Sequence, residues 1–351
     1  MINVGITGLG FMGMIHYLAY GRKRGISVKA ICETDPVRLA GDWRSIKGNF
    51  GPQGKKMDLA GIAKYSAFDE LLDDPTIDLV DICLPPSQHA DAVVAALKAG
   101  KHVFCEKPIA MKSTDAQRMV RTAKQTGKML SIGHVLPFFP EYRFAYRTVA
   151  SGKYGKVIGC SFKRMISDPL WMGHFYDPDV CGGPMLDLHI HDAHFIRLIC
   201  GMPKAVQTIG RMRGEVLEIF NSQFIYDGGS TTDGPMVTAT CGALMQQGRP
   251  FTHAFEIYLE KATLLFDFAT IGKNPTLAIP LTVMTNNGRV TQPKLGSGDP
   301  IDAFAEEIGE VIKSIRTETP SDLLDGQLAR DALILCHKQT QSAARGRTVK
   351  V

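Results

Sequence analysis

The first third of the chain alternates short apolar runs with longer amphipathic segments. Runs with the length and composition of buried strands lie at 2–7, 28–32, 79–84, 102–105 and 129–132. Segments with the pattern of helices lie at 11–24, 69–72, 89–100 and 114–126. Strands that alternate with helices are typical of parallel βαβ units, so this part of the chain predicts a doubly wound α/β domain.

The second half has a different pattern, in which strands follow one another directly. Strand-like runs lie at 157–165, 206–213, 220–226, 236–241, 252–259 and 262–268. Turn signals such as Asp227-Gly228-Gly229 and Asn286-Asn287-Gly288 join several of them. This order predicts a mostly antiparallel sheet, with amphipathic helices at 301–315 and 325–344. A chain of 351 residues suggests two domains, with a boundary near 130–135.

Composition excludes several classes of protein. The net charge is +5 and the basic residues are dispersed, so nucleic-acid binding is not indicated. No apolar run approaches the roughly 18–20 residues of a membrane span, and the first residues lack the pattern of a secretory signal. The eight cysteines form no C-x-x-C pair, so a zinc ribbon is not indicated and a reducing, cytoplasmic location is expected.

A glycine-rich turn lies between the first strand and the first helix. Gly8-Leu9-Gly10-Phe11-Met12-Gly13 fits the spacing G-x-G-x-x-G. Gly8 permits a tight turn, Gly10 lets a pyrophosphate approach the backbone, and Gly13 lets the helix pack on the strand. Phosphates would then lie at the positive end of the helix dipole. We therefore predict a dinucleotide site; the alternative is a glycine-rich turn that holds no ligand.

Glu33 stands at the end of the second strand, about twenty residues after Gly13. A carboxylate there accepts a hydrogen bond from the ribose 2′-hydroxyl and repels a 2′-phosphate. The position therefore favours NAD(H), with NADP(H) possible. The alternative is that Glu33 faces solvent and that Arg38 accommodates the extra phosphate.

Phe104-Cys105-Glu106-Lys107-Pro108 ends another strand of the predicted parallel sheet. A lysine just past a strand end lies where open α/β sheets bind ligands. Pro108 fixes the direction of the chain, and the Glu106 carboxylate can hold an ammonium in place. We therefore predict a functional role for Lys107, against the alternative of a solvated surface charge.

A second group of polar residues follows Gly182-Gly183-Pro184. Pro184 is well placed to begin a helix, and on a helix Asp187, His191 and His194 would share one face. A carboxylate one turn from a histidine can orient the ring of a general base. Two alternatives remain: a metal site, although His189 and Asp192 would point away from the other three, and a core network in which these groups satisfy one another.

Together, these residues resemble the Gfo/Idh/MocA oxidoreductases. The resemblance covers nearly the whole chain and is carried by the glycine turn, Pro85-Pro86-Ser87-Gln88-His89, Ala99–Pro108, Gly152–Val157, and Gly182-Gly183 with Asp187 and His191. It implies an N-terminal Rossmann domain (1–132) that binds NAD(P). It also implies a C-terminal α+β domain (133–351) whose large, open-faced sheet binds substrate and forms homodimers or homotetramers.

The resemblance also implies an activity and roles for particular residues. The expected enzyme is an NAD-dependent oxidoreductase acting on a hydroxyl or keto carbon of a sugar, cyclitol or sugar derivative. Lys107 would bind the reacting oxygen, His191 would exchange its proton, and Asp187 would hold His191. The expected cofactor contacts are Gly8, Gly10, Phe11, Met12, Gly13, Glu33, Leu84, Pro85, Pro86, His89, Glu106, Lys107 and His134. The expected substrate contacts are Lys107, Arg164, Trp171, His174, Tyr176, Asp187 and His191.

The chain departs from the family pattern at two positions. Pro137 stands near a position where relatives often have arginine, and His194 stands where many have aspartate. Two other functions are considered: a glycosidase or lyase that oxidises its substrate transiently with tightly held NAD, and an NAD-sensing regulator without turnover. Such regulators tend to lose catalytic residues, whereas Lys107, Asp187 and His191 are all present here.

Overall fold

The computed structural model describes residues 1–48, 50–226, 234–296 and 298–351. The chain forms two compact units: Met1–Phe139 with Ser297–Arg330, and Pro140–Gly296 with Asp331–Val351. Two segments expected in the C-terminal domain, 133–139 and Ser297–Arg330, thus belong to the first unit. The reason lies in packing: helix α8 (Pro300–Thr317) buries Phe304, Ile308 and other apolar side chains in the core of the first unit.

The first unit is built on a six-stranded sheet in which every neighbouring pair is parallel. Its strand order is β3-β2-β1-β4-β5-β6. The strands are β1 (Ile2–Thr7), β2 (Ile26–Cys32), β3 (Ala63–Tyr65), β4 (Leu79–Ile82), β5 (His102–Glu106) and β6 (Leu130–Gly133). This is the order of a Rossmann fold, which confirms the expected architecture of the N-terminal part.

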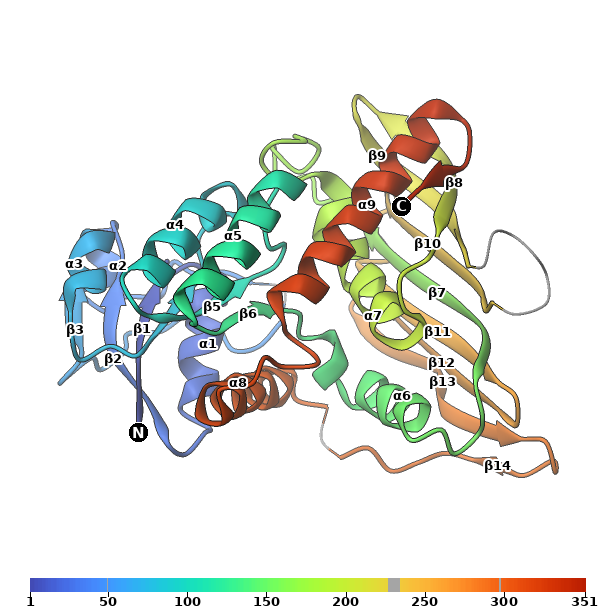
Figure 1. Cartoon of the computed structure of the whole chain (residues 1–351), viewed down its shortest axis with the longest axis horizontal. Coiled ribbons are helices and arrows are strands. Elements are labelled where there is room, and N and C mark those ends of the chain that lie inside the picture. The colour runs from blue at the N-terminus through green and yellow to red at the C-terminus, as the bar shows by residue number, and fades with distance from the viewer. Residues whose placement is uncertain (49, 227–233, 297) are drawn as a thin grey trace. The chain divides into compact units, whose positions relative to one another are not determined.

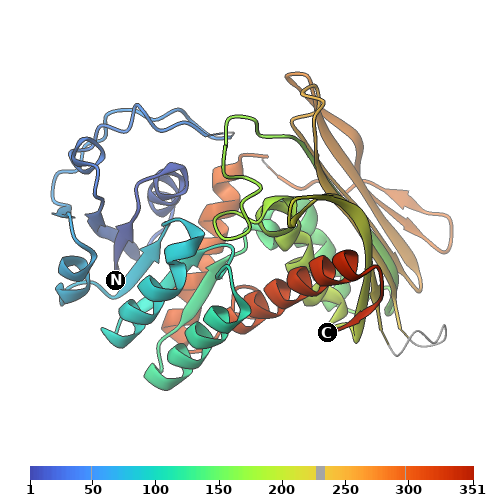
Figure 2. The ribbon, with the colours of Figure 1, turned by 90° about the horizontal axis from the view of Figure 1, so that it is seen from above.

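Helices cover both faces of this sheet (Figure 1). The helices of this unit are α1 (Phe11–Tyr20), α2 (Pro36–Leu39), α3 (Phe68–Asp73), α4 (Pro86–Lys98), α5 (Ser113–Thr126), the 3₁₀ helix η1 (Leu136–Phe138) and α8. Helices α4 and α5 pack together on one face, and α1 and α8 pack together on the other (Figures 1 and 2). All strands and helices expected here are present, with their ends shifted by a few residues, whereas α2 and β3 were not expected.

The order of the strands places a switch point between β1 and β4. From β1 the chain proceeds to β2 on one side, and β4 begins the other half of the sheet on the opposite side. In open α/β sheets, ligands bind outside the carboxyl ends of the strands at such a point. The turns that follow Thr7 and Ile82 therefore border the expected nucleotide site.

The second unit contains a nine-stranded sheet in the order β14-β13-β12-β11-β7-β10-β9-β8-β15. Its strands are β7 (Val157–Ser167), β8 (Ala205–Arg213), β9 (Val216–Ile225), β10 (Met236–Leu244), β11 (Phe251–Leu259), β12 (Ala262–Ile271), β13 (Asn274–Thr285), β14 (Val290–Thr291) and β15 (Val349–Lys350). Only β7 and β10 pair in parallel. The prediction of a mostly antiparallel sheet is confirmed.

One face of the second sheet is covered by α6 (Pro140–Ala150), α7 (Ile190–Cys200) and the part of α9 (Gly326–Arg345) that begins at Asp331 (Figure 2). Strand β13 was not expected, because Pro275 and Pro280 weaken the strand pattern in the sequence. In the structure its first five residues are exposed. The expected turn Asn286-Asn287-Gly288 joins β13 to β14, whereas Asp227-Gly228-Gly229 lies outside the described residues. No helix in the described residues is both long and apolar enough to cross a membrane.

Candidate functional site

The turn after β1 has the geometry that a dinucleotide requires. Gly8 has a φ of +86°, and a Cβ there would lie 2.7 Å from the Cys83 carbonyl oxygen. A Cβ on Gly13 would lie 2.1 Å from the Gly8 carbonyl oxygen, so any side chain would force the start of α1 away from β1. A Cβ on Gly10, by contrast, would meet no described atom within 4 Å. The backbone at Gly10 is thus open to an approaching phosphate, and the residues present fit a dinucleotide.

Glu33 is fixed beside this turn. One carboxylate oxygen accepts a hydrogen bond from the Leu9 backbone N–H at 2.7 Å, and the other accepts one from the Asp35 N–H at 3.0 Å. The half-buried side chain therefore joins the end of β2 to the glycine turn. The oxygen that accepts from Asp35 also accepts a hydrogen bond from the Thr34 hydroxyl at 3.3 Å, whereas the oxygen that accepts from Leu9 has a second acceptor direction and can still bind a ribose hydroxyl.

The turn after β4 carries Leu84, Pro85 and Pro86, none of which is buried. His89, which follows on α4, is fully buried, and its two ring nitrogens lie 2.8 Å from the carbonyl oxygens of Leu84 and Pro108. Burial lowers the pKa of His89, so the neutral ring donates to one carbonyl at a time. His89 thus links this turn to the segment after Lys107, and its expected contact with the cofactor stays a prediction.

Glu106 and Lys107, at the end of β5, differ in exposure. Lys107 is partly exposed, as a residue that meets a ligand must be. Glu106 is 6% exposed, and its carboxylate is engaged by the Lys107 backbone N–H at 2.9 Å and by a ring nitrogen of His16 at 3.1 Å. The Glu106 side chain therefore supports the lysine segment from inside, and its expected contact with the cofactor stays a prediction.

Sequence reasoning missed the group of polar side chains beneath this segment. His16 on α1 is fully buried; its Nδ1 lies 2.9 Å from an Asp81 oxygen, and its ring stacks on Phe104 with centroids 5.1 Å apart. The signal was present, because Asp81 is a charged residue inside the apolar run of β4 and such residues are almost never fully buried unless paired.

His16, Asp81 and Cys83 also bring three possible metal-ligand atoms within 4.8 Å of one another. However, the His16 Nδ1 and the Asp81 oxygen are already in direct hydrogen-bond contact, and the thiol lies 3.5 Å from the same nitrogen. Structural zinc sites usually have four ligands. We therefore interpret the group as a hydrogen-bonded network.

His134, another expected cofactor contact, follows β6 and is 0% exposed. Its side chain lies inside the first unit, so the structure gives no support to a contact with the nucleotide. The neighbouring hydrophobic residues Ile132 and Val135 are buried as well.

In the second unit, the segment expected to be helical begins with a π-helical turn. This turn, η2 (Pro184–His189), follows Gly182 and Gly183, which both have positive φ, and leads directly into α7. A Cβ on Gly183 would lie 2.4 Å from a methyl carbon of Val216, so the approach of β9 requires glycine. Asp187 lies in the π-helical turn, whereas His191 and His194 lie in α7. The three residues are therefore not spaced as on one uniform α-helix.

Burial separates the three residues expected on one face. Asp187 and His191 are partly exposed, whereas His194 is fully buried. His189 is also fully buried, beside the ring of Phe220, and burial lowers its pKa to about 4. Asp187 and His191 thus remain the two candidates from this segment that are open to a substrate.

Arg164 occupies a different position from the one expected. It lies on β7 with its side chain 4% exposed, and it forms two hydrogen bonds of 2.8 Å to Asp192, whose side chain is 1% exposed. Both charged groups are therefore committed to each other within the second unit. This burial against α7 gives no support to the expected role of Arg164 as a substrate contact.

The loop after β7 holds the other expected substrate contacts. Trp171 is 80% exposed and His174 is exposed, while Tyr176 is half-buried. The guanidinium of Arg213 lies 4.1 Å from the centre of the Tyr176 ring and donates a 2.7 Å hydrogen bond to Asp168. Arg213 and Asp168, which sequence reasoning missed, thus hold Tyr176 against the end of β8.

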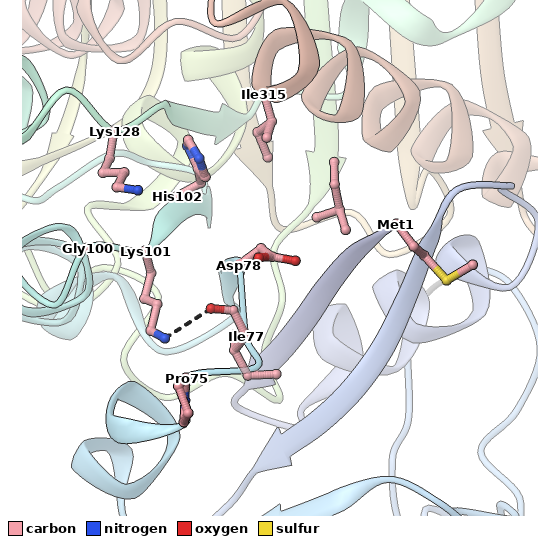
Figure 3. Close-up of a pocket in the computed structure, with 10 residues that line it drawn as sticks. Met1, Pro75, Ile77, Asp78, Gly100, Lys101, His102, Lys128 and Ile315 are labelled. Atoms are coloured by element: carbon pink, nitrogen blue, oxygen red, sulfur yellow. Dashed lines mark hydrogen bonds between the residues drawn. The ribbon is translucent and has the colours of Figure 1, made fainter.

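A hollow of about 400 Å³ lies at the opposite edge of the first sheet, beside the amino ends of β1, β4 and β5 (Figure 3). Its lining includes Lys101, whose ammonium donates to the carbonyl oxygens of Asp74 and Ile77 at 2.6 and 3.0 Å. This lysine anchors the start of β4. None of the expected cofactor or substrate residues lines the hollow, so we assign it no part in the proposed activity.

Comparison with known proteins gives two matches to one family. Residues 2–134 match the model of an oxidoreductase family with an NAD-binding Rossmann fold, Gfo/Idh/MocA. Residues 142–265 match the model of the Gfo/Idh/MocA C-terminal domain. The two matches together cover more than half of the chain.

Individual relatives match shorter stretches. A 1,5-anhydro-D-fructose reductase of Ensifer adhaerens is 34% identical over 142 residues, which cover 40% of this chain and 43% of the relative. A 2,7-anhydro-N-acetylneuraminate hydratase of Escherichia coli (strain K12) is 30% identical over 164 residues, which cover 47% of this chain and 40% of the relative. The chain thus spans less than half the length of these two relatives.

A solved structure matches the fold over its whole length. Levoglucosan dehydrogenase, in complex with NADH and levoglucosan, aligns with a TM-score of 0.79 at 20% sequence identity. The alignment covers 100% of this chain and 99% of that one. At this identity the likeness shows a shared fold alone.

Proposed function

Because the chain belongs to the Gfo/Idh/MocA oxidoreductase family, we propose that it is an NAD-dependent enzyme acting on a hydroxyl or keto carbon of a sugar, cyclitol or sugar derivative. The observation that carries the proposal is the turn after β1. Its glycines are required by close backbone contacts at Gly8 and Gly13, and its backbone is open at Gly10. A partly exposed lysine follows β5 of the same sheet, as a substrate-binding group should.

Gly8, Gly10, Phe11, Met12 and Gly13 would hold the pyrophosphate of NAD, with Leu84, Pro85 and Pro86 on the other side of the switch point. Glu33 would accept a hydrogen bond from the ribose. When bound, the nicotinamide supplies the hydride chemistry. The chain's own residues bind the two partners, orient them and move the proton.

Lys107 would donate a hydrogen bond from its ammonium to the reacting oxygen of the substrate. The positive charge stabilises the negative charge that develops on this oxygen as its proton leaves or arrives. A fixed donor of this kind is worth several kcal/mol in an enclosed site. Lys107 thus serves both oxidation of an alcohol and reduction of a ketone.

His191 would take the hydroxyl proton in oxidation and return it in reduction, as a general base and acid. Asp187, one turn before it, would orient the ring and favour its charged form. Trp171, His174 and Tyr176 would line the substrate side, with the indole ring of Trp171 offering an apolar face to a sugar. Arg164 is excluded from this set by its buried pairing with Asp192.

The test of the proposed function is an absorbance assay of the nicotinamide, with NAD and NADP, across free sugars, sugar acids, cyclitols and glycosides. We expect at least one of these compounds to drive net reduction of NAD. If none does, and no keto derivative drives the reverse reaction, the proposal fails.

A second candidate function is a hydratase, lyase or glycosidase that oxidises its substrate only transiently. The similarity to a 2,7-anhydro-N-acetylneuraminate hydratase favours this alternative. It predicts that NAD stays with the protein during purification and that product forms without net appearance of NADH. Product analysis by mass spectrometry, alongside the absorbance assay, distinguishes the two functions.

We further propose a cytoplasmic homodimer or homotetramer. The eight cysteines form no C-x-x-C pair, and this usage is typical of a reducing compartment. The second sheet exposes large apolar side chains, among them Ile209 (69%), Met236 (62%) and Leu277 (51%), which association with a second copy would cover. Light scattering measures the mass of the assembly.

Changing Glu33 to alanine is expected to lower the preference for NAD over NADP by about tenfold. The change removes both a charged hydrogen-bond acceptor for the ribose and the repulsion of a 2′-phosphate. The ratio of the two kcat/KM values measures the preference. Because Glu33 also holds Leu9, Glu33→Gln is the control: it removes the charge and keeps one amide oxygen as an acceptor, while an N–H₂ donor replaces the other carboxylate oxygen. An unchanged ratio in both variants would exclude the ribose contact.

Changing His191 to alanine is expected to lower kcat by about 10²-fold, because the proton would lose its acceptor. The control is His194→Gln on the same helix. Since His194 is fully buried, this change should lower the temperature of unfolding more than it lowers kcat. Steady-state kinetics and thermal unfolding separate the two effects, and full activity in His191→Ala would refute the assigned role.

A further inference from the structure

A continuous chain of contacts runs from helix α1 to the backbone of Lys107. His16 binds Asp81 through Nδ1 at 2.9 Å and Glu106 through Nε2 at 3.1 Å. The other oxygen of Glu106 accepts the Lys107 N–H at 2.9 Å. All these partners belong to the first unit, and none of His16, Asp81 and Glu106 is more than 6% exposed.

The ring of His16 can satisfy both carboxylates only when both of its nitrogens carry protons. Burial is the largest single influence and would lower the pKa of His16, but the neighbouring Asp81 and Cys83, together with their hydrogen bonds to the ring, outweigh burial and raise the pKa well above its usual value. A buried imidazolium between two carboxylates is a rigid arrangement, because losing any contact leaves a charge uncompensated.

The other titratable groups around the ring stay neutral. Glu307 on α8 is fully buried; burial and the charge of Glu106 raise its pKa well above the usual range. Burial and the charge of Asp81 likewise raise the pKa of Tyr20 on α1 and that of Cys83, the latter to about 12. Among these groups, the contacts between charged side chains are therefore those of His16 with Asp81 and with Glu106.

Neighbouring backbone packs closely around Glu106. A Cβ on Gly133 would lie 3.1 Å from the Glu106 oxygen that faces His16, so β6 closes over the carboxylate. On the other side of Lys107, the Pro108 carbonyl lies 2.8 Å from His89. The backbone on both sides of Lys107 is thus tied to buried side chains, while the lysine side chain itself is partly exposed.

We propose that His16 and Glu106 are positioning residues for Lys107: the ring of His16 fixes the Glu106 carboxylate, which fixes the backbone from which the lysine side chain projects. This inference rests on the proposed role of Lys107. His16 lies on the helix that begins at the dinucleotide turn, so the same helix would present the phosphate-binding backbone and support the lysine.

The test is a double-mutant cycle between Glu106→Gln and Lys107→Ala. In Glu106→Gln the amide oxygen can still accept the Lys107 N–H, but the amide N–H₂ group faces a protonated ring nitrogen. We expect kcat to fall about tenfold, the effect of one charged hydrogen bond, with the dissociation constant of NADH unchanged within twofold. In the Lys107→Ala background the same change should alter the residual kcat less than twofold, because Glu106 acts through the lysine.

Glu307→Gln is the matched control, since it makes the same substitution at an equally buried site beside the same ring. Glu307 is already neutral, so kcat should stay within twofold in both backgrounds. If Glu106→Gln lowers kcat by the same factor with and without Lys107, or if Glu307→Gln has the same effect, the positioning role is wrong. If Lys107→Ala alone keeps full activity, the proposed function of the lysine itself has failed.

A readout independent of turnover comes from hydrogen exchange at the Lys107 amide. Glu106→Ala removes its acceptor, so exchange should accelerate about tenfold or more, whereas Glu307→Gln should leave it unchanged. His16→Gln, chosen because it keeps a polar group at the site, should give an intermediate increase. An exchange rate that stays the same in Glu106→Ala and His16→Gln would overturn the inference, whatever the activity.

Discussion

Replacing Lys107 with alanine is expected to lower kcat by about 10²- to 10³-fold while leaving the fold and the affinity for NADH intact. The ammonium is the proposed donor to the reacting oxygen, and the loss of one such donor has an effect of this size. The side chain is partly exposed, so its removal leaves no large cavity in the core. Single-turnover kinetics on the identified substrate, together with NADH titration by fluorescence, separate chemistry from binding.

Lys112→Ala provides the control for Lys107. Lys112 is an exposed lysine close to Lys107 in sequence, so its loss removes the same charge without the proposed contact. Lys107→Arg adds a second comparison, because arginine keeps the charge but changes the shape of the donor. Full activity of Lys107→Ala on the true substrate would show that the lysine is a solvated charge.

Changing Asp192 to alanine is expected to destabilise the second unit by about 3–5 kcal/mol. The change would leave the guanidinium of Arg164 buried without its partner, and breaking a buried pair in this way is costly. The two side chains are 4% and 1% exposed, so solvent cannot replace the lost contact. The midpoint and slope of urea unfolding measure the effect.

The double variant Arg164→Met, Asp192→Leu tests whether the effect comes from the unpaired charge. Replacing both partners by apolar residues of similar size should recover most of the lost stability, because no charge then remains buried. If the double variant is less stable than Asp192→Ala, packing around the pair rather than charge accounts for the loss. A stability unchanged in Asp192→Ala would contradict the pairing itself.

Local features of the fold could be predicted because they depend on neighbours in sequence. The turn at Gly8 follows from residues that lie within one strand–turn–helix unit, and the structure shows the close contacts that require each outer glycine. The alternation of strands and helices likewise predicted the parallel sheet. The Asn286-Asn287-Gly288 turn was predictable from its own residues, and the structure shows the positive φ at Gly288 that such a turn uses.

Features that depend on distant residues could not be predicted in this way. Nothing near Arg164 in sequence indicates that Asp192, 28 residues further along the chain, will face it. The path from Asp81 through His16 to Glu106 joins three separate elements, so only the topology of the sheet brings these residues together. The packing of α8 on α1 could not be predicted either, because the two helices are far apart in the sequence.

The discontinuous first unit limits how the protein can be divided for experiments. The chain leaves this unit after Phe139 and returns to it at Ser297–Arg330. A fragment that stops before α8 would expose Ile15, Ile31 and the other apolar residues that now share a core with Phe304. Such a fragment would be prone to aggregate, so an autonomous nucleotide-binding half would require a linker grafted from Phe139 to the start of α8. A chimera that exchanges substrate halves would need three junctions, because the chain passes between the two units three times.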